Sequence, residues 1–323
     1  MPFVEVADGR IQSLKLEFNL SFHCNFSCSN CSHLSPHLAK SSASLDQFRR
    51  DVSALAKVYH VRRFCFVGGE PLLHRDILSF IDTVRESGLT DIIQVCTNGA
   101  LLHRAKDDFF RNIDILSISW YPDARIDRAK IESARARCVD NGTRLYIQPV
   151  RYFRKMNADS SENPHLTGQI YRSCQIAHSW YCQTFHNGMF YLCSRPLFTG
   201  ALSERDDPNT PNFVQHDGIP IHDDGLFERV VAYLRNDKPL ASCQLCLGTV
   251  GKSVRWRALS AKERRRPEVE RNPLTVLDRR RLWYLLGATC IQRGMIRIIP
   301  SLRFARVLTL LKDMPYRWSR RGF

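Results

Sequence analysis

Short apolar runs alternate with amphipathic helical segments over the first half of this chain. A helical segment begins after Ser44, where the spacing to Gln47 is that of a capping box, and another runs over 77–84. The expected strands lie at 13–21, 64–67, 92–96, 113–119 and 145–150. Several of these runs are apolar on both faces, which is typical of parallel strands covered by helices. The alternation therefore predicts an α/β fold with a parallel sheet.

The pattern changes after about residue 160. Two apolar runs flank Asn187-Gly188, a sequence that favours a tight hairpin turn. Residues 203–224 are rich in Asp, Pro, Asn and Gly and predict a loop, whereas 226–234 predict a helix. A chain of 323 residues is expected to form about two domains. We divide it into segments 1–165, 166–254 and 255–323.

Three cysteines follow the first predicted strand at a C-x3-C-x2-C spacing: Cys24, Cys28 and Cys31. Three thiolates on one loop can hold three irons of a [4Fe–4S] cluster and leave the fourth iron open to a small molecule. Zinc is the alternative, with His23 or His33 as the fourth ligand. Structural zinc sites usually pair two short motifs, however, so this spacing favours iron–sulfur.

Three further motifs follow the later strands. Gly68-Gly69-Glu70-Pro71 comes after the second strand, Thr97-Asn98-Gly99 comes after the third, and Ser117 and Ser119 lie on the fourth. Taken alone, each fits an ordinary turn or a serine bonded to the backbone. In this order, and together with the cysteine loop, they resemble the radical S-adenosylmethionine (SAM) superfamily. Asn30 stands where that family often has an aromatic residue.

The resemblance implies an incomplete (β/α)6 radical SAM barrel over 1–165. In that family SAM chelates the open iron of a [4Fe–4S] cluster, and an electron from the cluster cleaves SAM to a 5′-deoxyadenosyl radical, which takes a hydrogen atom from the substrate. Cys24, Cys28 and Cys31 are then the expected cluster ligands. SAM contacts are expected from Gly68, Gly69, Glu70, Pro71, Asn98, Ser117 and Ser119.

Five more cysteines lie beyond the expected barrel: Cys174, Cys182, Cys193, Cys243 and Cys246. With Gly188 on the hairpin, they resemble the twitch and SPASM extensions of radical SAM enzymes, which hold auxiliary [4Fe–4S] clusters. The number fits the smaller twitch type with one auxiliary cluster over 166–254. Cys193, Cys243 and Cys246 are the expected ligands, with Cys174 or Cys182 as the fourth and the other as a redox-active thiol. Local spacing alone fits a zinc ribbon equally well.

Cys65 and Cys96 lie on predicted strands of the barrel. A thiol that faces the barrel interior is able to return a hydrogen atom to a substrate, as in radical epimerases. The alternative is a small buried apolar residue, which is our interpretation of Cys138 and Cys290. Cys65 and Cys96 are therefore the candidate hydrogen donors.

Positive charge is concentrated at the C-terminal end. Residues 255–323 hold 18 of the 47 Lys and Arg but 5 of the 32 Asp and Glu, so they carry +13 of the net +15. Apolar clusters between the arginines predict a helical tail that lies on an anionic membrane surface or packs on the core. Nucleic acid is a less favoured partner because no RNA-binding motif accompanies the charge.

The sequence shows no signal peptide and no apolar run that could span a membrane, which predicts a cytoplasmic protein whose cysteines bind metal. We expect a radical SAM oxidoreductase or epimerase with an electron donor such as flavodoxin or ferredoxin. Its substrate is expected to be a small molecule or glycan of the sugar or cyclitol type, lipid-linked if the tail meets a membrane. A ribosomal peptide is the alternative substrate. A zinc-stapled scaffold or nucleic-acid adaptor is the alternative of another class.

Overall fold

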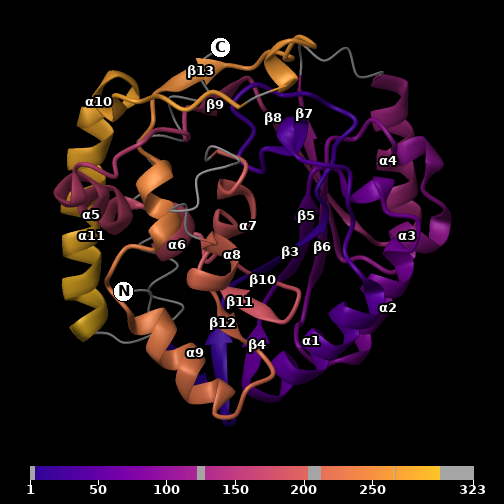
Figure 1. Ribbon diagram of the computed structural model, residues 1–323. Helices are drawn as coiled ribbons and strands as arrows, with labels where there is room; N and C mark the ends of the chain where they lie inside the picture. The colour runs from indigo at the N-terminus through magenta and orange to yellow at the C-terminus, as the bar shows by residue number, and fades with distance from the viewer. Residues whose placement is uncertain (1–3, 122–127, 203–211, 266, 299–323) are drawn as a thin grey trace.

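The computed structural model describes residues 4–121, 128–202, 212–265 and 267–298. Its centre is an eight-stranded sheet in the order β12-β11-β10-β3-β5-β6-β7-β8 (Figure 1). Strands β3, β5, β6, β7 and β8 run parallel, with helices between them along the chain. The predicted α/β fold with parallel strands is therefore confirmed.

The bounds of the strands and of the first two helices follow the predicted ranges to within a few residues. The strands are β3 (Leu16–Ser21), β5 (Phe64–Gly68), β6 (Ile93–Thr97), β7 (Ile115–Trp120) and β8 (Arg144–Pro149). The helices are α1 (Leu45–Val58), α2 (Ile77–Glu86), α3 (Asp107–Arg111) and α4 (Arg128–Asp140). Ser44 caps α1 by accepting a hydrogen bond from the backbone N–H of Gln47, as the capping-box spacing predicts.

The first predicted strand, 13–21, corresponds to β3, which begins three residues later. Residues 10–13 form β2 (Arg10–Ser13), which joins β1 (Glu5–Ala7) and β4 (Tyr59–Val61) in a separate three-stranded sheet. Only β3 enters the central sheet. Leu14 lies before β3 but alternates with the apolar residues of that strand, so the alternation does not reveal where β3 begins.

Phenylalanines pack between the central sheet and its helices. Phe18 of β3 lies against Phe48 of α1 with ring centroids 4.4 Å apart, and Phe48 stacks on Phe185 at 5.7 Å. All three are buried. Because side chains alternate along a strand, the odd-numbered residues of β3 point to the opposite face of the sheet. That face carries the polar network described below.

The chain departs from six successive strand–helix units after β8. Residues 152–154 form β9 (Tyr152–Arg154), which pairs with β13 (Ser253–Arg255) rather than with β8. A further parallel strand, β10 (Gln183–His186), pairs with β3 at the other side of the sheet. It forms the predicted hairpin with β11 (Met189–Tyr191), since Asn187 and Gly188 both have positive φ.

The C-terminal half is mainly short helices. They are α5 (Pro164–Ser173), α6 (Gln175–His178), α7 (Pro196–Thr199), α8 (Phe213–His216), α9 (Leu226–Arg235), α10 (Pro273–Val276) and α11 (Arg279–Ile298). Single-turn 3-10 helices lie at Ser35–His37, Pro71–Leu73, Leu102–Arg104, Ala241–Leu245 and Glu263–Arg265. The predicted loop at 203–224 contains α8 and β12 (Ile219–Pro220), so that expectation was wrong for its second half. Residues 203–211 lie outside the described residues.

Helix α11 runs beside α5 (Figure 1). Leu282 and Leu285 are buried in a second apolar core with Leu166 of α5, whereas Trp283 and Ile291 are exposed. The beginning of the tail is thus helical and packed on the molecule; residues 299–323 lie outside the described residues. Among the helices the structure describes, none is long and apolar enough to cross a membrane. A membrane surface as partner of the tail stays a prediction.

Candidate active site and cysteine clusters

The loop after β3 brings Cys24, Cys28 and Cys31 together at the carboxyl end of the parallel strands. A segment far along the chain holds this loop from outside. The backbone N–H of Ser29 donates to the carbonyl of Arg257 at 2.9 Å, and that of Leu259 donates to Ser27 at 2.7 Å. Residues 257–259, which the sequence assigns to the tail segment, thus cover the first cysteine loop.

The glycine pair at the end of β5 packs directly under the same loop. Gly69 donates its N–H to the carbonyl of Ser21 at 2.6 Å, and a Cβ at Gly69 would lie 2.0 Å from the carbonyl oxygen of His23. Gly68 has φ +130°, and a Cβ there would lie 2.4 Å from the oxygen of Ser21. Both positions therefore require glycine, because the backbone of β3 and of the cysteine loop fills the space of a side chain.

Glu70 joins the second motif to the third. Its carboxylate accepts hydrogen bonds from the Thr97 hydroxyl at 2.6 Å and from the backbone N–H groups of Asn98 at 2.8 Å and Leu72 at 3.1 Å. The side chain is fully buried, and burial raises its pKa against the lowering effect of these donors. Glu70 therefore fixes the turn after β6. A contact between Glu70 and SAM stays a prediction, as does one from Pro71.

Asn98 connects that turn back to the cysteine loop. Its Nδ2 donates to Oδ1 of Asn25 at 2.7 Å and lies 3.6 Å from Sγ of Cys24. On β7, Ser117 lies opposite Cys96 of β6 in the strand register. The structure therefore brings Asn98 to the cysteines, while contacts of Ser117 and Ser119 with SAM stay predictions.

The donor set of the first loop fits an iron–sulfur cluster with three protein ligands. Burial raises the pKa of Cys24 to about 11 and that of Cys28 to about 12, and each thiolate is further disfavoured by the negative charge of its neighbours. Such thiols lose their protons only when a bound cation compensates the charge. Among the described residues, no three His, Cys, Asp or Glu side chains converge closely enough for a single metal ion.

A cavity next to the cysteine loop is lined by Cys31 and by five charged residues: Lys155, Arg257, Glu263, Glu268 and Glu270.

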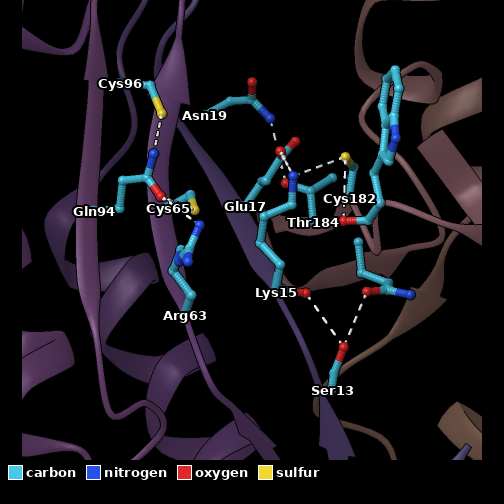
Figure 2. A network of polar contacts seen from close by, with 12 residues as sticks. Ser13, Lys15, Glu17, Asn19, Arg63, Cys65, Gln94, Cys96, Cys182 and Thr184 are labelled. Carbon is cyan, nitrogen blue, oxygen red and sulfur yellow. Dashed lines mark hydrogen bonds and ion pairs between the residues drawn. The ribbon is translucent and has the colours of Figure 1, made fainter. Parts of the chain in front are cut away.

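Charged residues face the interior side of the sheet next to β10 (Figure 2). The ammonium of Lys15 donates to Oε1 of Glu17 at 2.7 Å and to Sγ of Cys182 at 3.1 Å. Burial lowers the pKa of Lys15, but the Cys182 sulfur when it is ionised, together with the Glu17 carboxylate, outweighs this effect and raises it well above its usual value. Burial raises the pKa of Glu17, yet the neighbouring ammonium holds it below its usual value. Both residues are therefore charged in the folded protein.

Cys65 and Cys96 share this interior face with that pair (Figure 2). Gln94 lies between them: the Cys65 thiol donates to its Oε1 at 3.6 Å, and its Nε2 donates to Sγ of Cys96 at 3.3 Å. Burial raises the pKa of the Cys65 thiol well above its usual value and that of Cys96 to about 11. Burial likewise raises that of Cys182 to about 12. The interior therefore holds three thiols that keep their hydrogen at neutral pH.

The other four late cysteines line one pocket: Cys174, Cys193, Cys243 and Cys246. Burial raises the pKa of Cys193 and Cys243 well above the usual value, and the negative charge of neighbouring cysteines in the pocket raises both further. A Cβ at Gly248 would lie 2.9 Å from Sγ of Cys174, so the backbone approaches that thiol closely. Of the two predicted alternatives for the fourth member, the structure places Cys174 here and Cys182 with Lys15.

The sequence motifs do not identify Lys15, Glu17 or Arg195. Lys15 and Glu17 are polar residues at alternate positions of a strand that is buried on both faces, which is a signal for an interior site. Arg195 follows Cys193 by two residues but has no motif of its own. Its side chain is buried beside the four-cysteine pocket.

Comparison with known families supports the motifs of the first loop. Residues 18–120 match the model of the radical SAM superfamily. A SAM-dependent nucleotide dehydratase of Selenomonas ruminantium is 28% identical over 109 residues, which are 32% of this chain and 38% of that protein. A GTP 3′,8-cyclase of Tolumonas auensis is 31% identical over 107 residues, or 32% of each chain. The chain thus matches about a third of the length of these curated relatives.

Solved structures align over more of the chain. The structure of anSMEcpe with bound AdoMet aligns with a TM-score of 0.45 and 12% identity, covering 87% of this chain and 97% of that chain. BtrN in complex with AdoMet and 2-DOIA aligns with a TM-score of 0.41 and 15% identity, covering 72% and 92%. From the family match, residues 18–120 of this chain form a radical SAM superfamily domain.

Proposed function

We propose that this protein is a radical SAM enzyme that cleaves SAM reductively and abstracts a hydrogen atom from its substrate. The observation that carries the proposal is the convergence of three motifs on one loop. Gly69 hydrogen-bonds the strand that leads into the loop, Asn98 contacts Cys24, and Glu70 ties the two motifs together. A [4Fe–4S] cluster on Cys24, Cys28 and Cys31 would supply the electron and an open iron for SAM.

The interior face of the sheet is the proposed substrate site. Lys15 and Glu17 present opposite charges, and Asn19 donates to the hydroxyl of Thr184 at 3.3 Å beside them. Such a set of donors and acceptors fits a hydroxylated sugar or cyclitol better than an apolar molecule. A ribosomal peptide is the second candidate substrate; no contact of the described residues favours it.

Two outcomes compete after hydrogen abstraction. Dehydrogenation requires that the substrate radical lose a second electron and a proton. Epimerisation instead requires a hydrogen atom from a thiol, for which Cys65, Cys96 and Cys182 are the candidates on the interior face. The charged state of Glu17 allows it to accept a proton.

The four-cysteine pocket is the proposed auxiliary site of the twitch type. Four thiols in one buried pocket match the four ligands of a closed [4Fe–4S] cluster. Two polar atoms at this pocket, Nε of Arg195 and Oγ of Ser242, are buried without a partner in the part of the chain that the structure describes, which fits a group that accepts hydrogen bonds there. This cluster would accept the second electron in a dehydrogenation.

A flavodoxin or ferredoxin is the proposed reductant of the first cluster, which is the cluster on Cys24, Cys28 and Cys31.

Iron and sulfide analysis of anaerobically prepared protein tests both clusters. We expect about eight irons for two [4Fe–4S] clusters, and formation of 5′-deoxyadenosine from SAM with dithionite. Cys28→Ala should abolish that product, whereas Cys138→Ala, which changes a buried cysteine away from either site, should not. A colourless protein that contains zinc and leaves SAM intact would instead support the scaffold or adaptor alternative.

The reaction outcome requires a separate measurement. Candidate sugars and cyclitols are incubated with SAM and dithionite in deuterated water, and the products are analysed by mass spectrometry. Solvent deuterium at the reacting carbon marks epimerisation, and loss of two hydrogens from the substrate marks dehydrogenation.

A further inference from the structure

Arg195 lies between the two cysteine sites. It comes two residues after Cys193 and directly before α7, and its side chain is only 4% exposed. Nη1 donates to the carbonyl of Ser32 at 3.0 Å, and Nη2 donates to Oδ1 of Asn157 at 3.0 Å. Both acceptors are neutral. The guanidinium is therefore a buried cation whose hydrogen-bond partners, in the described part of the chain, carry no negative charge.

The carbonyl of Ser32 belongs to the first cysteine loop, directly after Cys31. One end of Arg195 thus holds the loop of the proposed SAM cluster. Arg195 also forms part of the wall of the four-cysteine pocket. The same residue therefore contacts both proposed iron–sulfur sites.

The Nε–H of Arg195 has no acceptor among the described residues. Ser242, 1% exposed, lines the same pocket with a hydroxyl that likewise has no partner within the described ranges. Buried polar atoms normally find partners, and a buried cation is costly unless an anion compensates it. A cluster held by four thiolates is anionic and accepts hydrogen bonds at its sulfurs, so it would satisfy both requirements.

We propose that Arg195 raises the reduction potential of the auxiliary cluster while it fixes the first cysteine loop to the wall of the auxiliary pocket. The inference rests on the auxiliary cluster proposed above. One-electron reduction adds a negative charge to the cluster, and a nearby cation and an N–H donor stabilise the reduced form more than the oxidised form. Arg195 is in this sense a positioning residue that sets how readily the auxiliary site accepts an electron.

Two neutral variants, Arg195→Gln and Arg195→Met, test the proposal. The readout is the midpoint potential of the auxiliary cluster in an anaerobic redox titration followed by electron paramagnetic resonance. We expect the equilibrium constant for one-electron reduction to fall at least tenfold, which corresponds to a shift of 59 mV to lower potential. Arg195→Lys keeps the positive charge and should fall between wild type and the neutral variants. Arg235→Gln, on the exposed side of α9, is the matched control and should leave the potential unchanged.

Two results would overturn the role of Arg195. One is an unchanged potential in either neutral variant that keeps its auxiliary cluster. The other is loss of the auxiliary iron from both neutral variants, since Arg195 would then be needed only to build the pocket. A wild-type protein with about four irons is a different failure: it refutes the auxiliary cluster itself, and this inference with it.

Discussion

Lys15 donates a hydrogen bond to the sulfur of Cys182 across 3.1 Å, although 166 residues separate the two along the chain. The contact exists because β10 pairs in parallel with β3 and places Thr184 opposite Glu17. Because of this strand pairing, Cys182 lies beside Lys15 and apart from the four cysteines that line the auxiliary pocket. Sequence spacing cannot make this distinction, because Cys174 and Cys182 both precede the hairpin.

The separation of these two cysteines predicts different iron contents for two variants. Cys174→Ala removes a thiol from the pocket and should lower the iron content by about four per chain. Cys182→Ala removes a thiol that contacts Lys15 instead, and should keep both clusters. Iron and sulfide analysis after anaerobic reconstitution measures the difference. Equal losses in the two variants would show that Cys182 is a ligand.

Much of the fold follows from the sequence for a simple physical reason. Strand periodicity and the caps of α1 and the hairpin depend on neighbouring residues, so local patterns predict them. Local patterns do not predict which strands pair with one another. The pairing of β10 with β3, and of β9 with β13, depends on contacts between residues more than 90 positions apart.

The candidate site also has residues that the sequence predicts and residues that it does not. The cysteine loop, the glycine pair and Asn98 are contiguous motifs with fixed spacing, and the structure brings them together as the resemblance implies. Arg195 and Lys15 act through contacts with distant segments, so a motif search does not find them. Glu70 is intermediate: the motif singles it out, but its contacts with Thr97 and Asn98 appear only in three dimensions.

The close approach at Gly69 predicts a large effect of a single methyl group. A Cβ at this position would lie 2.0 Å from the carbonyl of His23, which forces the cysteine loop away from β5. Gly69→Ala should therefore reduce the iron content of the first cluster and 5′-deoxyadenosine formation together. Gly200→Ala is the matched control, since nothing lies within 4 Å of a Cβ there. Normal SAM cleavage by Gly69→Ala would show that the loop is not positioned by this contact.

The hydrogen bonds of Glu70 predict a cost in folding stability. In Glu70→Gln, an amide NH2 replaces one carboxylate oxygen and faces either the Asn98 N–H or the Leu72 N–H beside the Thr97 hydroxyl. A buried donor is then left unsatisfied, and we expect a loss of about 1–3 kcal/mol in the free energy of unfolding. Urea unfolding of the variant and wild type measures it.

A double-mutant cycle separates the Glu70–Thr97 contact from other effects. Thr97→Val removes the hydroxyl but keeps the shape of the side chain. If the two residues act through their 2.6 Å hydrogen bond, the double variant should lose less stability than the sum of the single variants. Additive losses would contradict a direct coupling.

His186 at the end of β10 predicts that mild acid destabilises the fold. Burial lowers its pKa from 6.5 to about 4, although the charge of Asp51 acts in the opposite direction. Between these two pH values the unfolded chain binds the proton and the folded chain does not. Stability is therefore complete above pH 6.5 and falls as the pH is lowered towards 4, by about 3 kcal/mol at most.

The pH profile of urea unfolding between pH 7 and pH 5 tests the role of His186. His186→Gln cannot take up this proton, so its stability should fall less over that interval than that of wild type. His103→Gln, which changes an exposed histidine, should follow the wild-type profile. Parallel profiles for wild type and His186→Gln would mean that another group takes up the proton. The comparison must be of slopes rather than of absolute stability, because the ring of His186 also packs edge-on against Phe22 at 4.8 Å and its removal carries a cost that does not depend on pH.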